Sequence, residues 1–140
     1  MRIMGIDYGE KRFGIALSDP LGITAQGLPT IERTSIQEDI KKIINILQEK
    51  EVEEIVLGLP KHLNNTLGDK AKEVLNFIDT LKKHINIPIK TFDERFSTVR
   101  ANRAMLEGDL SRKKRKERVD MIAAQLILQG YLDMIKTKTS

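Results

Sequence analysis

The spacing of apolar residues first changes near residue 34, and this change restricts the possible folds. Before it, apolar stretches at residues 2–7, 13–18 and 25–32 are separated by turns. This pattern predicts three consecutive strands in an antiparallel meander. Pro29 cannot donate a ladder hydrogen bond, so the third strand should lie at or near a sheet edge.

Helices and strands should alternate in the second part of the chain. Residues 36–47 carry apolar side chains on one helical face, and Ser35 and Glu38 have the spacing of a capping box. Residues 55–60 form an apolar run that suits a central strand buried on both faces. The remaining expected elements are a helix capped by Thr66 or Asp69, a strand over 88–92, a helix capped by Ser97 or Thr98, and a last helix over about 117–135. We therefore predict an α/β fold with a mixed five-stranded sheet flanked by helices, in which the later strands are parallel.

Composition limits the class of protein. The chain has 140 residues, of which 40% are hydrophobic, so we expect a single domain over 1–140 with a core of its own. It has no cysteine, which excludes a disulfide scaffold and thiolate chemistry. No apolar run approaches the ~20 residues that span a bilayer. The acidic Asp7 comes too early for a signal peptide. We expect a cytoplasmic protein without a membrane partner.

Positive charge is concentrated in one short segment. The net charge is +4, yet the chain without residues 112–118 has 18 basic and 19 acidic residues. The basic residues of the segment are Arg112, Lys113, Lys114, Arg115, Lys116 and Arg118. Such a cluster suits the phosphates of a nucleic acid. A solvated surface without a partner explains it equally well.

Acidic residues stand where predicted apolar elements end or pack. Asp7 ends the first predicted strand, and Asp93 and Glu94 follow the last one. Sites in open sheets gather at strand carboxyl ends, so these acids meet if the two strands run the same way. Asp120 shares the apolar face of the last helix, and its carboxylate should point at the sheet. The apolar members of that face are Ala123, Ala124, Ile127, Leu128 and Tyr131.

Converging carboxylates suggest one chemistry, and each acid also has a structural explanation. Carboxylate oxygens suit Mg²⁺ or Mn²⁺, and paired ions of this kind promote phosphodiester hydrolysis. Alternatively, Asp7 can hydrogen-bond the turn that follows it, and Asp120 can be favoured by the positive end of a helix. Asp93 or Glu94 can pair with the adjacent Arg95. The residues alone leave both interpretations open.

Five short motifs follow one another over almost the whole chain. They are Gly5–Gly9, Arg12–Asp19, Gly58–Pro60, Asp93–Thr98 and Val119–Gln129. Together they resemble the bacterial YqgF family, also called RuvX. Its members are described as Holliday junction resolvases and as pre-16S rRNA nucleases.

The resemblance implies a ribonuclease H-like fold and a metal-dependent endonuclease that acts on structured nucleic acid. Processing of the 5′ end of pre-16S rRNA is the expected reaction. The resemblance also implies that Asp7, Glu94 and Asp120 are the catalytic residues and hold one or two Mg²⁺ or Mn²⁺ ions. Asp93 would be a supporting ligand, and Arg95 would orient a carboxylate or touch phosphate.

Substrate binding and the competing hypotheses complete these expectations. We expect Lys61 and the run Arg112, Lys113, Lys114, Arg115 and Lys116 to contact the nucleic-acid backbone without reading sequence. Alternative functions are resolution of Holliday junctions in branched DNA and nucleic-acid binding with little catalysis. A sugar-kinase or actin-like ATPase is disfavoured, because 140 residues leave no room for its second domain. The sequence leaves open whether the protein is a monomer or a homodimer.

Overall fold

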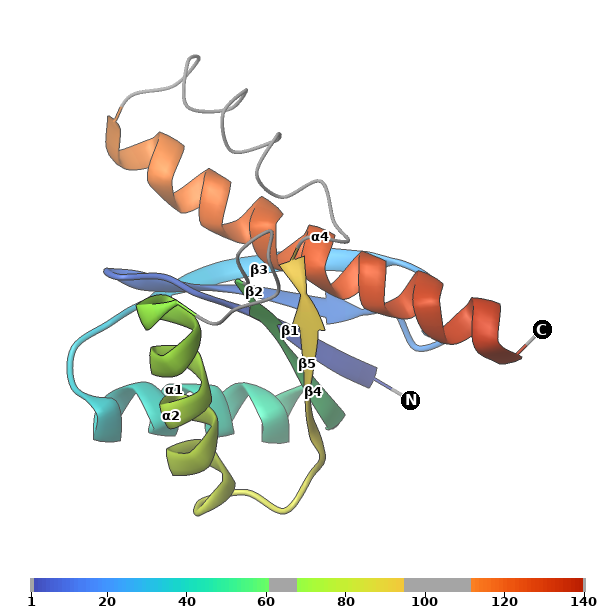
Figure 1. The fold of residues 1–140 in the computed structure, drawn as a ribbon, viewed down its shortest axis with the longest axis horizontal. Helices are drawn as coiled ribbons and strands as arrows, with labels where there is room; N and C mark the ends of the chain where they lie inside the picture. Colours follow the sequence, from blue (N-terminus) through green and yellow to red (C-terminus); the bar gives the residue numbers. More distant parts are fainter. Residues whose placement is uncertain (1, 61–67, 95–111, 140) are drawn as a thin grey trace.

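Five strands form one sheet between two helical layers (Figure 1). A computed structural model describes residues 2–60, 68–94 and 112–139, and within them the side chains of 2–60, 68–94 and 117–136. The helices of these ranges are α1 (Ile36–Glu49), α2 (Asp69–Lys82) and α4 (Arg112–Thr139). Helices α1 and α2 cover one face of the sheet, and the long helix α4 crosses the other.

The sheet has the strand order β3-β2-β1-β4-β5. The strands are β1 (Arg2–Tyr8), β2 (Arg12–Ser18), β3 (Ala25–Glu32), β4 (Val52–Leu59) and β5 (Ile89–Asp93). Pairing is antiparallel from β1 to β2 and from β2 to β3, and parallel from β1 to β4 and from β4 to β5. The predicted mixed five-stranded sheet is confirmed, and β3, which contains Pro29, is an edge strand as expected.

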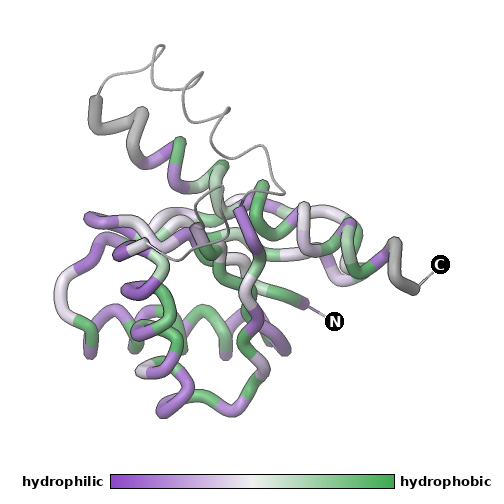
Figure 2. The backbone as a smooth tube through the Cα atoms, in the orientation of Figure 1, coloured by the Kyte–Doolittle hydropathy of each residue, from purple (hydrophilic) through white to green (hydrophobic). Residues whose placement is uncertain are grey.

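Two hydrophobic cores lie on the two faces of the sheet. The strands alternate their side chains between them, so Met4 and Ile6 of β1 pack with α1 and α2, whereas Ile3 packs with α4. Hydrophobic and hydrophilic residues alternate along α1 and α2, in keeping with one buried face on each helix (Figure 2). Asp7 of β1 lies on the same face of the strand as Ile3, the face that packs with α4.

The helix starts agree with the sequence in one case and differ in another. Ser35 caps α1, and its Oγ accepts a hydrogen bond from the backbone N–H of Glu38 at 3.2 Å. The cap predicted for α2 is wrong, since Gly68 is the N-cap and makes no side-chain hydrogen bond. Asp69 is instead the first helical residue, where the helix dipole favours an acid. Thr66 lies outside the described residues, as does the helix expected after Ser97 or Thr98.

Two boundaries fall earlier than predicted. Strand β4 begins at Val52, which packs in the core, rather than at residue 55. Helix α4 begins at Arg112 rather than near residue 117, because lysine and arginine are good helix formers and the basic segment is helical. Asp120 therefore lies about two turns inside the helix. The explanation of Asp120 by the helix dipole is wrong, because that effect is confined to the first turn.

None of the described helices is both long enough and apolar enough to cross a membrane.

Candidate active site

Asp7 is a buried carboxylate on the α4 face of β1. Its side chain follows the face of Ile3 and Gly5, which meets α4. The residue is only 2% exposed. Burial of a carboxylate costs free energy unless hydrogen bonds or opposite charges compensate it. The fold thus keeps an acid at a position where its own strand otherwise buries apolar or small residues.

Helix α4 brings Asp120 to Asp7. Gly14 of β2 is the ladder partner of Asp7, and a Cβ at Gly14 would overlap the backbone carbonyl oxygen of Asp120. The same Cβ would lie 3.3 Å from the Cβ of Asp7. A Cβ at Gly9 would lie 3.8 Å from Oδ2 of Asp120, so the carboxylate itself is near the β1–β2 turn. Two acids from opposite ends of the chain therefore lie next to one another.

Glu94 reaches the same region from the end of β5. The parallel register pairs Ile6 of β1 with Leu57 of β4, so the next residues along, Asp7 and Gly58, lie side by side. A Cβ at Gly58 would lie 2.9 Å from Oε1 of Glu94. Gly58 and Gly14 thus flank Asp7 on its two neighbouring strands. Because glycine has no side chain, Gly58 leaves room for Glu94 and Gly14 leaves room for Asp120.

Arg12 is a buried cation that the sequence reasoning did not single out. It lies two residues before Gly14, on the α4 face of β2, and its side chain is 9% exposed. Its Nη1 is 3.6 Å from Oδ2 of Asp120, and its Nε donates to Oε1 of Glu32 at 3.2 Å. The available signal was strand alternation, which puts Arg12 on the same side of its strand as Gly14. The sequence did not tell which side the last helix covers.

The donor set suits a hard divalent cation, although it does not form a finished cage. Asp7, Glu94 and Asp120 offer carboxylate oxygens, which Mg²⁺ and Mn²⁺ prefer. Within the described parts of the chain, no three His, Asp or Glu side chains form a group that would hold an ion as they stand. Asp120 is paired with Arg12 instead. The backbone brings the three acids into one region, and their carboxylates are the groups that would hold such an ion.

The other expected site residues lie elsewhere or outside the described residues. Asp93 pairs in register with Leu59, whose side chain packs in the core under α1 and α2, so strand alternation puts Asp93 on that face. Lys61 and Arg95 lie outside the described residues. The backbone of Arg112–Lys116 forms the start of α4, and the side chains of this run are not among those described.

A surface cavity of about 730 Å³ adjoins the candidate site between β3 and α4. Glu32, the partner of Arg12, forms part of its wall. Pro29, Met121 and Ile122 give it an apolar side, and Arg118 and Gln125 add polar groups.

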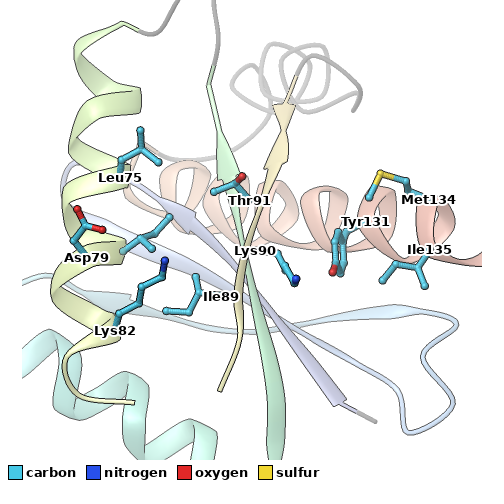
Figure 3. Close-up of a pocket in the computed structure, with 10 residues that line it drawn as sticks. Leu75, Asp79, Lys82, Ile89, Lys90, Thr91, Tyr131, Met134 and Ile135 are labelled. Carbon is cyan, nitrogen blue, oxygen red and sulfur yellow. The ribbon is translucent and has the colours of Figure 1, made fainter. Parts of the chain in front are cut away.

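A second cavity, of about 600 Å³, runs along β5 between α2 and α4 (Figure 3). Its lining contains none of the three acids proposed as ligands. Tyr131 on its wall donates a hydrogen bond to Oε2 of Glu54 at 3.0 Å. Burial, together with the bond to Glu54 and its charge, raises the pKa of Tyr131 to about 12. The cavity is therefore separate from the acidic site and contains a tyrosine that is neutral at physiological pH.

Comparison with known sequences connects the chain to nucleases. A family model described as "RuvX: Holliday junction resolvase" matches residues 1–134. A protein of Clostridium acetobutylicum named "Putative pre-16S rRNA nuclease" is 58% identical over 135 residues, covering 96% of this chain and 100% of that protein. A protein of Clostridium kluyveri with the same name is 56% identical, covering 96% and 98%.

Comparison with solved structures concerns the fold. Thermus thermophilus RuvC in complex with a Holliday junction substrate superposes with a TM-score of 0.65 at 14% identity, covering 99% of this chain and 98% of that one. The fowlpox virus resolvase in complex with Holliday junction DNA gives a TM-score of 0.57 at 12% identity, covering 96% and 99%. These likenesses confirm the predicted ribonuclease H-like fold.

Proposed function

The chain belongs to the RuvX family, and on that basis we propose that it is a metal-dependent endonuclease that processes the 5′ end of pre-16S rRNA in the cytoplasm, acting as one domain over residues 1–140. The observation that carries the proposal is the approach of Asp7, Glu94 and Asp120 around two glycines. The name of its relatives supports ribosomal precursor RNA as the substrate.

Asp7 is the central acid of the proposed site. It lies between Gly14 and Gly58, and the other two acids approach over these glycines. We assign Asp7, Glu94 and Asp120 as the ligands of one or two Mg²⁺ or Mn²⁺ ions. When bound, such ions activate water and stabilise the leaving oxygen in phosphodiester hydrolysis.

The protein holds the proposed ligands and the basic run in fixed positions relative to one another. The burial of Asp7 and the contact of α4 with Gly14 fix two of the acids relative to the sheet. Helix α4 carries both Asp120 and the basic run Arg112–Lys116. The helical rise puts Lys116 only ~6 Å along the axis from Asp120. Substrate phosphates held by this run would therefore lie close to the acids, and Lys61 and Arg95 would add further backbone contacts.

The test is cleavage by purified protein with Mg²⁺ or Mn²⁺ and with excess chelator. Asp7→Asn, Glu94→Gln and Asp120→Asn should each reduce the rate by about 100-fold or more, because a bound metal supplies several kcal/mol of transition-state stabilisation. The exposed Asp79 of α2 offers a matched control, and Asp79→Asn should cleave like the wild type. Full activity in Asp7→Asn and Asp120→Asn would refute the proposal.

Resolution of Holliday junctions is the second candidate, because the family is described by that activity. Cutting a four-way junction needs two active sites, whereas an RNA end can be processed by one. The two functions are separated by comparing a leader-containing 16S precursor with a four-way DNA junction, each beside a duplex of the same sequence. Preferential cutting of the junction by a dimer would replace the RNA assignment and keep the nuclease assignment.

A further inference from the structure

We propose that Arg12 is a positioning residue, an internal counter-ion that holds the carboxylate of Asp120 in the metal-free protein and competes with the metal ion for it. The inference rests on the proposed function, since it concerns how the same acids take up an ion. It adds Arg12 and Glu32 to the residues that control the site.

The geometry around Arg12 is asymmetric. Its guanidinium lies between Glu32, whose side chain is 57% exposed, and Asp120, whose side chain is 19% exposed. The contact to Glu32 at 3.2 Å is a hydrogen bond, whereas Nη1 and Oδ2 of Asp120 are 3.6 Å apart. Arg12 is thus anchored on Glu32 and attracts Asp120 through a looser ion pair.

Exchange of partners needs only a side-chain rotation. The backbone of Asp120 is fixed above Gly14, where there is no room for even a Cβ. A change of partner must therefore come from rotation of its side chain rather than from movement of α4 toward β2. Arginine does not lose its proton in proteins, so Arg12 stays charged and its attraction for Asp120 persists until another cation takes its place. A divalent ion beside Asp7 would supply that cation.

Glu32 should weaken this competition. Its carboxylate contacts the same guanidinium as Asp120 does, and its negative charge partly neutralises that of Arg12. Removal of Glu32 would free the full charge of Arg12 for Asp120. Substitutions of the two residues should therefore change metal affinity in opposite directions, which a purely structural role does not predict.

The test measures Mn²⁺ affinity of metal-free protein by calorimetry, without any substrate. Arg12→Gln should bind Mn²⁺ about tenfold more tightly, as expected from removing a unit charge ~6 Å from a divalent ion in a water-like dielectric. Glu32→Gln should bind it several-fold more weakly, and the double variant should resemble Arg12→Gln. Arg12→Lys keeps the charge and should stay close to the wild type. In the absence of metal, Arg12→Gln should unfold at lower urea concentration.

The exposed pair of Lys41 and Glu38, 3.5 Å apart, supplies a matched control. Lys41→Gln and Glu38→Gln should leave Mn²⁺ affinity unchanged. Unchanged or weaker Mn²⁺ binding by Arg12→Gln would overturn the proposed competition. The proposal would also fail if Glu32→Gln lowered Mn²⁺ affinity equally in the wild type and in Arg12→Gln. If Arg12→Gln fails to fold, the exposed Glu32 still gives a decisive variant. If the wild type binds no Mn²⁺, the nuclease proposal fails as well. If the wild type binds Mn²⁺ and the variants bind it equally well, only the role of Arg12 is refuted.

Discussion

The contact between α4 and β2 makes Gly14→Ala a direct test of how the site is assembled. The added Cβ would overlap the carbonyl oxygen of Asp120 and lie 3.3 Å from the Cβ of Asp7. Both neighbours belong to or adjoin the backbone of packed elements, so no side-chain rotation relieves the overlap. Helix α4 must move away from the sheet, and Asp120 must move with it.

The expected cost follows from overpacking. Extra methyl groups in a packed core cost about 1–3 kcal/mol, and a rigid backbone neighbour favours the upper end. Alanine recovers only about 0.5–1 kcal/mol of backbone entropy relative to glycine. We expect the free energy of unfolding to fall by about 2–3 kcal/mol. The melting temperature should fall by roughly 5–10 °C, from about 2–4 °C per kcal/mol for a chain of this size.

Gly27→Ala is the matched control, because it adds a methyl group on the same face of the sheet under the same helix. Its Cβ would lie 2.7 Å from Cγ and 2.8 Å from Sδ of Met121, a flexible side chain that can turn aside. We expect a loss of about 1 kcal/mol or less. Urea unfolding followed by circular dichroism, with the slope compared between variants, measures both. Equal stability of Gly14→Ala and Gly27→Ala would refute the close packing of α4 on Gly14.

Three further predictions concern stability, pH and substrate binding. Ser35→Ala should lower the free energy of unfolding by about 1 kcal/mol through loss of the α1 cap. A value near zero would mean that the bond from Glu38 is not formed in solution. Tyr131→Phe should cost about 1–3 kcal/mol at neutral pH, since Glu54 loses a buried donor. Because the pKa of Tyr131 rises from 10.0 to about 12, its stabilisation is complete below pH 10 and is lost as the pH approaches 12. Urea titrations of both proteins across that range should show the difference shrinking, and a constant difference would contradict the assignment. Replacing Lys113 and Lys114 with glutamine should make the slope of log affinity for RNA against log salt shallower by roughly 1.5. An unchanged slope would place the phosphate contacts elsewhere.

Local patterns in the sequence predicted much of the architecture. The change of apolar spacing near residue 34 gave the meander and the alternating strands and helices, because a strand or helix buries one face at its own period. The helical period also put Asp120 on the face of α4 that packs against the sheet. They were less reliable at element ends, where Gly68 rather than Thr66 or Asp69 caps α2, since backbone groups at helix ends can be satisfied without a side-chain cap.

Relations between distant segments came from the packed structure. Three relations depend on how the strands and the helix stack. Arg12 pairs with Asp120, Glu94 approaches Gly58 while Asp93 lies on the other face, and helix α4 contacts Gly14. Periodicity tells which side of an element a residue occupies, because successive side chains have fixed directions. It contains no information on the separation of two elements, which is set by the size of every side chain between them. The chemistry of these acids is sensitive to separations of about an ångström, so residue types indicated the kind of site, and only close packing in three dimensions established which charges face each other.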